Sequence, residues 1–431
     1  MADTRETDVL ILGAGFAGLT AARRIAASHR VLLVDRHAYQ TLRPKLPEAV
    51  AGTSPCAVRL PVVDALEGTP VEFLPASVLE IDPERRLVET DTGPLRYARL
   101  VVALGSQPHI PAPGSVPGAA EFALPLWDFE HACAIRRRVT LQAHSAARAA
   151  SAPERRAAAS VVVVGAGFAG VEVAGQLQDR LVALTEAFGL ALGEAQVHVV
   201  ERAPRILPTF APALARAVAQ DLVRRGVVLH LNASVRAVTG DAVILADGTT
   251  LPAGAVIWAG GVRAADAVAA LGAPLAAGRI PVDSTLRSRA WPDVYAVGDA
   301  AAVTAPNGEL LAQSAQIAMQ AGAAVAVSVA RDLAGLPPRP RHLSERGAAL
   351  GLGARSAAAV VAAGNLMLTG WPARLIKDAA LAHYLLALGG LRLAGAYLDP
   401  VILQPRRGRI EVGNPRMAVQ HTDPAPRLVT R

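Results

Sequence analysis

Cysteine and lysine are both scarce in this chain of 431 residues. The two cysteines, Cys56 and Cys133, are too few and too far apart for a disulfide framework or a metal site. We therefore expect a reducing compartment and no bound metal. The only lysines are Lys45 and Lys377, and the other basic residues are arginines. The net charge of +7 would suit an anionic partner, but no basic stripe carries the interleaved aromatic residues on which bases stack, so we expect no nucleic acid ligand.

Two kinds of apolar segment are also missing. The N-terminal residues 1–8 are polar and run directly into a strand-like segment, without the apolar core and cleavage site of a signal peptide. We therefore expect a cytoplasmic protein. Near the other end, the apolar segment Leu375–Leu398 is interrupted by Lys377, Asp378, His383 and Arg392. It therefore lacks the run of about 18 uncharged residues that a membrane-spanning helix needs.

One glycine-rich hexapeptide, GAGFAG, occurs twice, at 13–18 and again at 165–170. Each copy ends an apolar run of strand length and opens an alanine-rich helical segment. In G-x-G-x-x-G the first glycine permits a tight turn, the second lets the backbone approach a pyrophosphate, and the third lets helix and strand pack closely. The helix N-terminus then offers free N–H groups and a positive dipole to the phosphates. The duplication predicts two dinucleotide sites in one chain.

An acidic residue ends the next strand in both units. Asp35 follows Val31–Val34, and Glu201 follows Val197–Val200. A carboxylate at this place accepts hydrogen bonds from the ribose hydroxyls of an adenine dinucleotide. Glu201 favours NADH, because it repels the extra phosphate of NADPH, although the neighbouring Arg202 weakens that preference.

The alternation of apolar strands and helical segments predicts an α/β fold with two Rossmann-like domains. Three further strands end in glycine: LVVALG (100–105), VIWAGG (256–261) and VYAVGDA (294–300). The last returns the chain to its first domain, so the second domain is inserted in the first. The expected ranges are 1–118 and 283–335 for the first domain, 119–160 for a helical linker, 161–282 for the second domain and 336–431 for a C-terminal extension.

In this order, these motifs resemble the flavoprotein pyridine-nucleotide reductases, and among them the type II NADH dehydrogenases, which are NADH:quinone oxidoreductases. Glu172, just inside the second helix, matches a family glutamate near the nicotinamide and flavin. The stretch 315–320, AQIAMQ, matches the family signature A-Q-x-x-x-Q, whose glutamines line the quinone pocket. A C-terminal extension follows the core, as the family's membrane-anchoring segment does.

The resemblance implies hydride transfer from NADH to FAD, followed by delivery of two electrons to a membrane quinone without proton pumping. The implied FAD-binding residues are Gly13, Gly15, Phe16, Ala17, Gly18, Asp35, Arg36, Val78, Ala103, Gly105, Gly298 and Asp299. The implied NADH-binding residues are Gly165, Gly167, Gly170, Glu201, Gly260 and Gly261. The implied catalytic residues are Glu172, Gln316, Gln320 and Lys45, the last as a cation beside the flavin.

Several of these residues have simpler interpretations. Glu172 would also favour a helix N-terminus through the dipole, and Gln316 and Gln320 suit a partly exposed helix face. Lys45 and Arg43 are equally consistent with surface charges. The segment RPKLP at 43–47 and the tripeptide at 103–105, Ala–Leu–Gly rather than Ala–Thr–Gly, depart from the family pattern. A ferredoxin-type reductase and a flavin-binding redox sensor remain as alternatives, whereas a disulfide reductase lacks its dithiol.

The segment Leu375–Leu398 predicts an amphipathic helix lying at a membrane surface. We expect Trp371, Leu375, Tyr384 and Leu388 to face lipid and Arg374 and Lys377 to meet head groups, with the basic stretch 406–409 contributing. The alternative is a helix packed on the core or in a homodimer interface. Beyond Gly413 a loose tail is expected.

Overall fold

The computed structural model describes residues 5–52, 58–191, 193–272, 274–361 and 366–402. Its first sheet has the spatial order β5 (Glu72–Pro75), β2 (Val31–Asp35), β1 (Arg5–Leu12), β8 (Gly93–Val102), β7 (Leu87–Thr90) and β6 (Val78–Asp82). β20 (Val294–Ala296) also pairs with β8, in parallel, so a segment from late in the chain joins the sheet of the first residues. Cys56 and the basic stretch at 406–409 lie outside the described residues.

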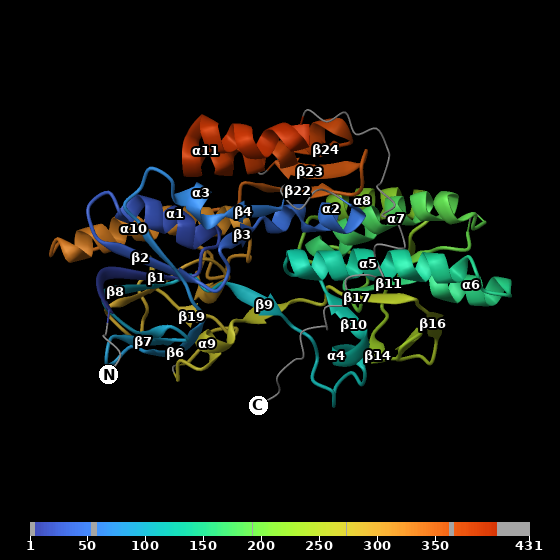
Figure 1. Ribbon diagram of the computed structural model, residues 1–431, viewed down its shortest axis with the longest axis horizontal. Helices are drawn as coiled ribbons and strands as arrows, with labels where there is room; N and C mark the ends of the chain where they lie inside the picture. The colour runs from blue at the N-terminus through green and yellow to red at the C-terminus, as the bar shows by residue number, and fades with distance from the viewer. Residues whose placement is uncertain (1–4, 53–57, 192, 273, 362–365, 403–431) are drawn as a thin grey trace.

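Helices α1 (Phe16–Ile25) and α10 (Ala315–Leu333) pack together against this sheet (Figure 1). Small residues set their separation. A Cβ atom on Gly322 would lie 2.4 Å from the carbonyl oxygen of Ala17, inside van der Waals contact. The strands beneath are buried along their apolar runs, which explains why they carry no alternating polar residues.

The second sheet is entirely parallel, in the order β10 (Ala123–Pro125), β17 (Ala255–Trp258), β11 (Val161–Val164), β12 (Val197–Val200) and β13 (Val228–His230). Helices α5 (Phe129–Ala146), α7 (Phe168–Phe188) and α8 (Pro212–Arg224) contribute to the hydrophobic core beside it. A small antiparallel sheet of β14 (Val235–Val238), β15 (Ala242–Leu245) and β16 (Thr250–Pro252) completes this unit. The pair β9 (Ser106–Pro108) and β18 (Val262–Ala264) connects the two units.

The C-terminal extension lies across both units along one edge of the molecule, drawn at the top of Figure 1. It consists of an antiparallel sheet of β22 (Gly347–Gly351), β23 (Ala357–Val361) and β24 (Leu366–Thr369), and of the long helix α11 (Trp371–Ile402). The helix is kinked, because Gly389 and Gly390 have non-helical backbone angles. By length and composition Trp371–Tyr397 is apolar enough to cross a membrane. A third of its apolar 18-residue stretch is, however, buried inside the protein.

The predicted lipid-facing side of this helix is only partly correct. Trp371 and Leu375 are 73% and 55% exposed, as expected for a surface stripe. Tyr384 and Leu388 are buried, and the Tyr384 hydroxyl donates to Oε1 of Gln40 at 2.8 Å. This face of the helix therefore packs on the first unit, where α1 and α3 (Val62–Leu66) lie against it and the Tyr384 ring centre is 4.6 Å from that of Phe16.

Two histidines face each other on adjacent strands of the second sheet. Nδ1 of His198 on β12 lies 3.1 Å from Nε2 of His230 on β13. Burial lowers the pKa of His198 to about 4, and the neighbouring His230 adds to the effect. Burial also lowers the pKa of His230. The folded protein therefore disfavours the protonated imidazoles that the unfolded chain would form.

Because the folded-state pKa of His198 lies below its unfolded value of about 6.5, stability falls as the pH drops from 6.5 toward 4. We expect His198→Gln to flatten the decline of the melting temperature between pH 7 and pH 5, removing about 1–2 kcal/mol of pH-dependent destabilisation. Thermal denaturation across this range measures the effect. Equal slopes for the two proteins would contradict it.

Candidate active site

The first glycine-rich turn joins β1 to α1. Gly13 has a φ of +104°, and a Cβ atom there would lie 2.3 Å from the carbonyl oxygen of Ala103. A Cβ atom on Gly18 would lie 1.8 Å from the carbonyl oxygen of Gly13. Around Gly15, in contrast, nothing lies within 4 Å of the Cβ position. The outer glycines are thus required by packing, and the middle one faces open space at the helix N-terminus.

The second turn, between β11 and α7, repeats this arrangement. Gly165 has a φ of +97° and abuts the carbonyl oxygen of Ala259, and Gly170 abuts that of Gly165. Gly167 faces open space, as Gly15 does. The two turns are therefore equivalent cradles, each formed by a helix N-terminus and a glycine whose missing side chain leaves open space.

The acidic residues at the strand ends brace these turns. Asp35 accepts the backbone N–H of Ala14 at 2.7 Å, and Glu201 accepts that of Ala166 at 2.8 Å. Each carboxylate therefore holds the backbone inside its own G-x-G. This contact was not anticipated from the sequence, which predicted only a ribose contact.

Asp299 lies where the first sheet meets the segment preceding α2 (Leu46–Ala51). Its carboxylate accepts a hydrogen bond from the Ser106 hydroxyl at 2.6 Å and lies 3.6 Å from Nη1 of Arg43. The Arg43 guanidinium in turn stacks on the ring of Trp127, 3.6 Å from its centre. Ser106 and Trp127 were missed by sequence reasoning, because neither belongs to a spaced motif. Arg43 was named, and its contacts distinguish it from an isolated surface charge.

The other residues implied for cofactor binding are distributed over both units. Gly105 follows β8, and a Cβ atom added to it would lie 3.9 Å from Nη2 of Arg43. Gly298 precedes Asp299 with a φ of +64°. The remaining members are Phe16 and Ala17 in the first turn of α1, Arg36 after β2, Val78 at the start of β6, and Gly260 and Gly261 after β17.

Glu172, in the first turns of α7, is buried, with 2% of its side chain exposed. Its Oε1 lies 2.5 Å from Nζ of Lys377 on α11 and accepts the backbone N–H of Gly351 at 2.7 Å. Burial raises the pKa of Glu172, and Lys377 opposes that shift. Lys377 was expected at lipid head groups; that prediction is wrong, because the buried carboxylate needs a cation.

Lys45, in the short 3-10 helix η1 (Arg43–Lys45), is 1% exposed. Its Nζ lies 3.0 Å from Oδ1 of Asp378 and 3.3 Å from Oε2 of Glu48. Arg374, also predicted at head groups, instead lies 3.3 Å from Oε1 of Glu48. Together these residues form what we call the ion cluster: Lys45, Glu48, Glu172, Arg374, Lys377 and Asp378. It joins η1 and α2, α7, and α11, and it contains both lysines of the chain.

Gln316 and Gln320 share one face of α10, and each binds the backbone of the segment that leads into β22. Gln316 donates to the carbonyl of Gly347 at 2.9 Å and accepts the N–H of Arg346 at 3.0 Å. Gln320 donates to the carbonyl of Ser344 at 2.9 Å and accepts its N–H at 3.1 Å. The two amides therefore clamp the C-terminal extension onto the first unit.

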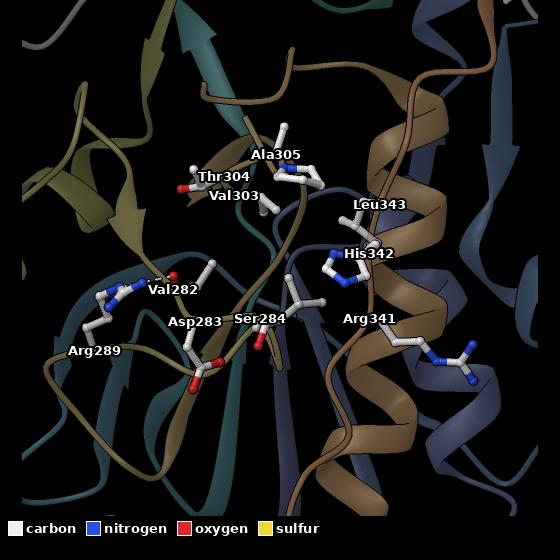
Figure 2. Close-up of a pocket in the computed structure, with 12 residues that line it drawn as sticks. Val282, Asp283, Ser284, Arg289, Val303, Thr304, Ala305, Arg341, His342 and Leu343 are labelled. Carbon is white, nitrogen blue, oxygen red and sulfur yellow. Dashed lines mark hydrogen bonds between the residues drawn. The ribbon is translucent and has the colours of Figure 1, made fainter. Parts of the chain in front are cut away.

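A hollow of about 180 Å³ lies elsewhere in the first unit, between the loops after β19 (Ile280–Pro281) and β21 (Ala301–Ala302) and the segment after α10 (Figure 2). Asp283, Arg289 and His342 are among its lining residues, and no residue of the two glycine-rich turns is. The Asp283 carboxylate is occupied by the N–H and hydroxyl of Thr285. The chemistry described above therefore lies outside this hollow.

Comparison with known proteins agrees with the two-cradle geometry. The model of the pyridine nucleotide-disulphide oxidoreductase family matches residues 7–322, and the chain belongs to that family. Type II NADH:quinone oxidoreductases of Staphylococcus haemolyticus and Staphylococcus aureus are each 30% identical over 397 residues, which cover 90% of this chain and 97% of theirs. Within the family, the chain is therefore a member of the type II NADH:quinone oxidoreductase group.

Solved structures agree with this fold. The NDH2 of Plasmodium falciparum, solved in complex with NADH, superposes with a TM-score of 0.82 at 16% identity, over 94% of this chain and 99% of that one. The sulfide:quinone oxidoreductase of Aquifex aeolicus superposes with a TM-score of 0.72 at 19% identity, over 92% and 93%. The match to NDH2 spans nearly its whole length, so the C-terminal extension is part of the shared architecture.

The contrast between Gly15 and Gly18 gives a paired prediction. Gly18→Ala should lower the melting temperature of the ligand-free protein, because overpacking against backbone costs about 1–3 kcal/mol or more. Gly15→Ala should leave it nearly unchanged but weaken adenine dinucleotide binding at least tenfold, because the methyl group enters the open cradle. Calorimetry and ligand titration measure the two effects. Equal loss of stability in both variants would contradict the assignment.

Proposed function

We propose that this protein is an FAD-dependent NADH:quinone oxidoreductase. The observation that supports this most is the pair of equivalent cradles, one in each sheet-based unit, in a chain that aligns with curated type II enzymes over nearly their full length. One cradle binds the resident cofactor and the other the substrate dinucleotide. When bound, FAD supplies the two-electron chemistry, taking hydride from NADH and passing electrons to the quinone.

The residues of the first unit suit FAD. The open position at Gly15 accepts a pyrophosphate at the N-terminus of α1, flanked by Phe16 and Ala17. Asp35 holds the turn and is placed for the adenosine ribose. The pair Asp299 and Arg43 lies at the other end of the sheet edge, where a cation stabilises negative charge on a reduced flavin.

The second unit would hold NADH. Gly167 leaves its cradle open, and Glu201, 8% exposed, disfavours the additional phosphate of NADPH. Gly260 and Gly261 follow the adjacent strand β17, so the dinucleotide would lie along backbone. Glu172 lies in the first turns of α7, the helix that starts at this cradle, and its carboxylate accepts the Gly351 N–H of the C-terminal extension.

Gln316 and Gln320 would border the quinone site. Their amides hold segment 344–347 in place, so we assign them the positioning of that segment beside the flavin as well as contact with the quinone. Lys45 lies at the same junction, in the ion cluster. These roles distinguish the proposal from a ferredoxin-type reductase, which would use a protein acceptor, and from a redox sensor, which would turn over negligibly.

The decisive test is steady-state NADH oxidation by purified, FAD-loaded protein with quinone, ferricyanide and ferredoxin compared side by side. We expect quinone to be the preferred acceptor and stopped-flow mixing with NADH to bleach the flavin rapidly. Rapid bleaching with ferredoxin as the preferred acceptor would favour the ferredoxin-type reductase. Negligible bleaching would favour the redox sensor.

Gln316→Leu separates the half-reactions. It removes both hydrogen bonds to residues 346 and 347, so we expect the KM for quinone to rise several-fold while NADH-to-flavin reduction is spared. Gln316→Glu, which keeps the acceptor for the Arg346 N–H, should give an intermediate value. An equal change in both half-reactions would overturn the assignment of Gln316 to the quinone side.

We further propose that the extension rests on the inner face of the cell membrane. β24 and α11 present exposed apolar side chains on one side of the molecule: Leu366, Met367, Trp371 and Leu375. We call these four side chains the apolar patch; exposed large apolar side chains on β24 and in the first turns of α11 suit the interfacial region of a bilayer. A quinone dissolved in that bilayer would reach the site without crossing water.

This surface can be tested with lipid vesicles. Trp371→Ser combined with Leu375→Ser should reduce co-sedimentation with vesicles at least tenfold, because both side chains are exposed and mainly lose burial in lipid. Val63→Ser with Leu79→Ser, two exposed apolar residues of the first unit, is the matched control and should bind like the parent protein. Equal binding by both double variants would show that the patch does not meet lipid.

A further inference from the structure

The distribution of lysine points to a role for Lys45 other than that of a cation beside the flavin. In a chain with 43 basic residues, the two lysines occupy the same buried cluster, and Lys45 stands in the segment that departs from the family pattern. A fully buried ammonium group is costly unless carboxylates neutralise it. The presence of Lys45 at 1% exposure therefore requires a compensating arrangement, which the cluster supplies.

The carboxylates of the cluster differ in how many cations they contact. Among the residues that the structure describes, three cations lie within 4 Å of Glu48, namely Lys45, Arg374 and Lys377. Asp378 has Lys45 at 3.0 Å and Arg374 at 3.7 Å. Within the described part of the chain, Glu172 has only Lys377, at 2.5 Å, together with the N–H of Gly351 on β22. Lys377 is therefore shared between Glu172 and Glu48, which lies 3.8 Å away.

We propose that Lys45 is a positioning residue: by neutralising Glu48 and Asp378, it leaves Lys377 bound to Glu172 and keeps the Glu172 carboxylate ionised. The six side chains sum to zero charge when all are ionised. Without Lys45 the cluster carries an excess negative charge, and Lys377 is drawn toward Glu48. A carboxylate must then take up a proton to restore neutrality.

Without Lys45, Glu172 is the carboxylate that would take up this proton. Asp378 is 16% exposed, so water helps to stabilise its charge, and Glu48 retains two cations. Glu172 is 2% exposed and would lose part of its only cationic partner. The remaining neighbours of its carboxylate are the Gly351 N–H, which donates to it, and the charge of Glu48, which opposes its ionisation.

The test measures the Glu172 proton directly, by pH titration of the infrared carbonyl band of a protonated carboxyl group in FAD-loaded protein without quinone. The band is assigned by its loss on Glu172→Gln. We expect Lys45→Met to raise the titration midpoint of Glu172 by about one pH unit, because Lys377 is then drawn from Glu172 toward Glu48, and an adjacent cation lowers a carboxyl pKa by about 1–3 units. Lys45→Arg should restore the parent midpoint.

The double variant Lys45→Met with Asp378→Asn separates charge from structure. It restores a neutral cluster without restoring any contact of Lys45, so we expect the midpoint to return to within about half a pH unit of the parent value. An unshifted midpoint in a folded Lys45→Met protein, or a double variant that stays shifted, would overturn the proposal. If Lys45→Met fails to fold, Lys45→Gln takes its place, with the same expected shift and the same contradicting result.

The inference rests on the proposed function only in giving Glu172 a role at the active site. Its failure is distinguishable, because the carboxyl titration needs neither NADH turnover nor quinone. A shifted midpoint in a protein that reduces no quinone would support the role of Lys45 and reject the proposed acceptor. Normal quinone reduction with an unshifted midpoint would support the proposed acceptor and reject the role of Lys45.

Discussion

The structure depends on mutual neutralisation of charge in a region that excludes water. Three carboxylates and three cations, drawn from η1 and α2, from α7 and from α11, meet in the ion cluster. Desolvating any one of them alone would cost several kcal/mol, and removing a single partner from a buried pair typically costs about 3–5 kcal/mol. Each segment is therefore stable in its place only when the other two are present. The two dinucleotide-binding units and the C-terminal extension are bound into one body by this condition.

The cradles impose a second, more local constraint. In both turns the outer glycines are fixed by backbone atoms closer than any side chain allows, and the acid at the following strand end holds the turn from outside. The open space at the middle glycine is thus rigid before any ligand arrives. Preformed binding sites of this kind lose little entropy on binding, which helps a protein that must align two ligands.

Much of the fold was predictable, because the signals were local. The duplicated hexapeptide and the glycine-ended strands reflect steric demands within a few residues, and the acids at 35 and 201 end the strands that pair with those preceding each hexapeptide. The α/β class and the Rossmann-like units followed from them. Long-range packing was less accessible. Tyr384 and Leu388 looked lipid-facing in an apolar helix, but the face they share meets the first unit.

The site was predictable only in part, for the same reason. Spacing indicated that Gln316 and Gln320 share a face, but not that backbone amides of residues 344–347 would occupy them. Lys45 could not be separated from a surface charge, because its partner Asp378 lies 333 residues away along the chain. Charge compensation between residues far apart in the chain produces no periodic pattern in a sequence. The rarity of lysine was the available sign that Lys45 is not an ordinary surface charge.

That rarity has a practical consequence for solution chemistry. Both side-chain primary amines of this protein are enclosed, with Lys45 1% and Lys377 5% exposed. Acylating reagents in solution can reach them only when the junction between the units and the extension opens. The rate of lysine acylation would therefore report how often that junction opens, with almost no signal from surface lysines. A bound ligand that closes the junction would lower this rate.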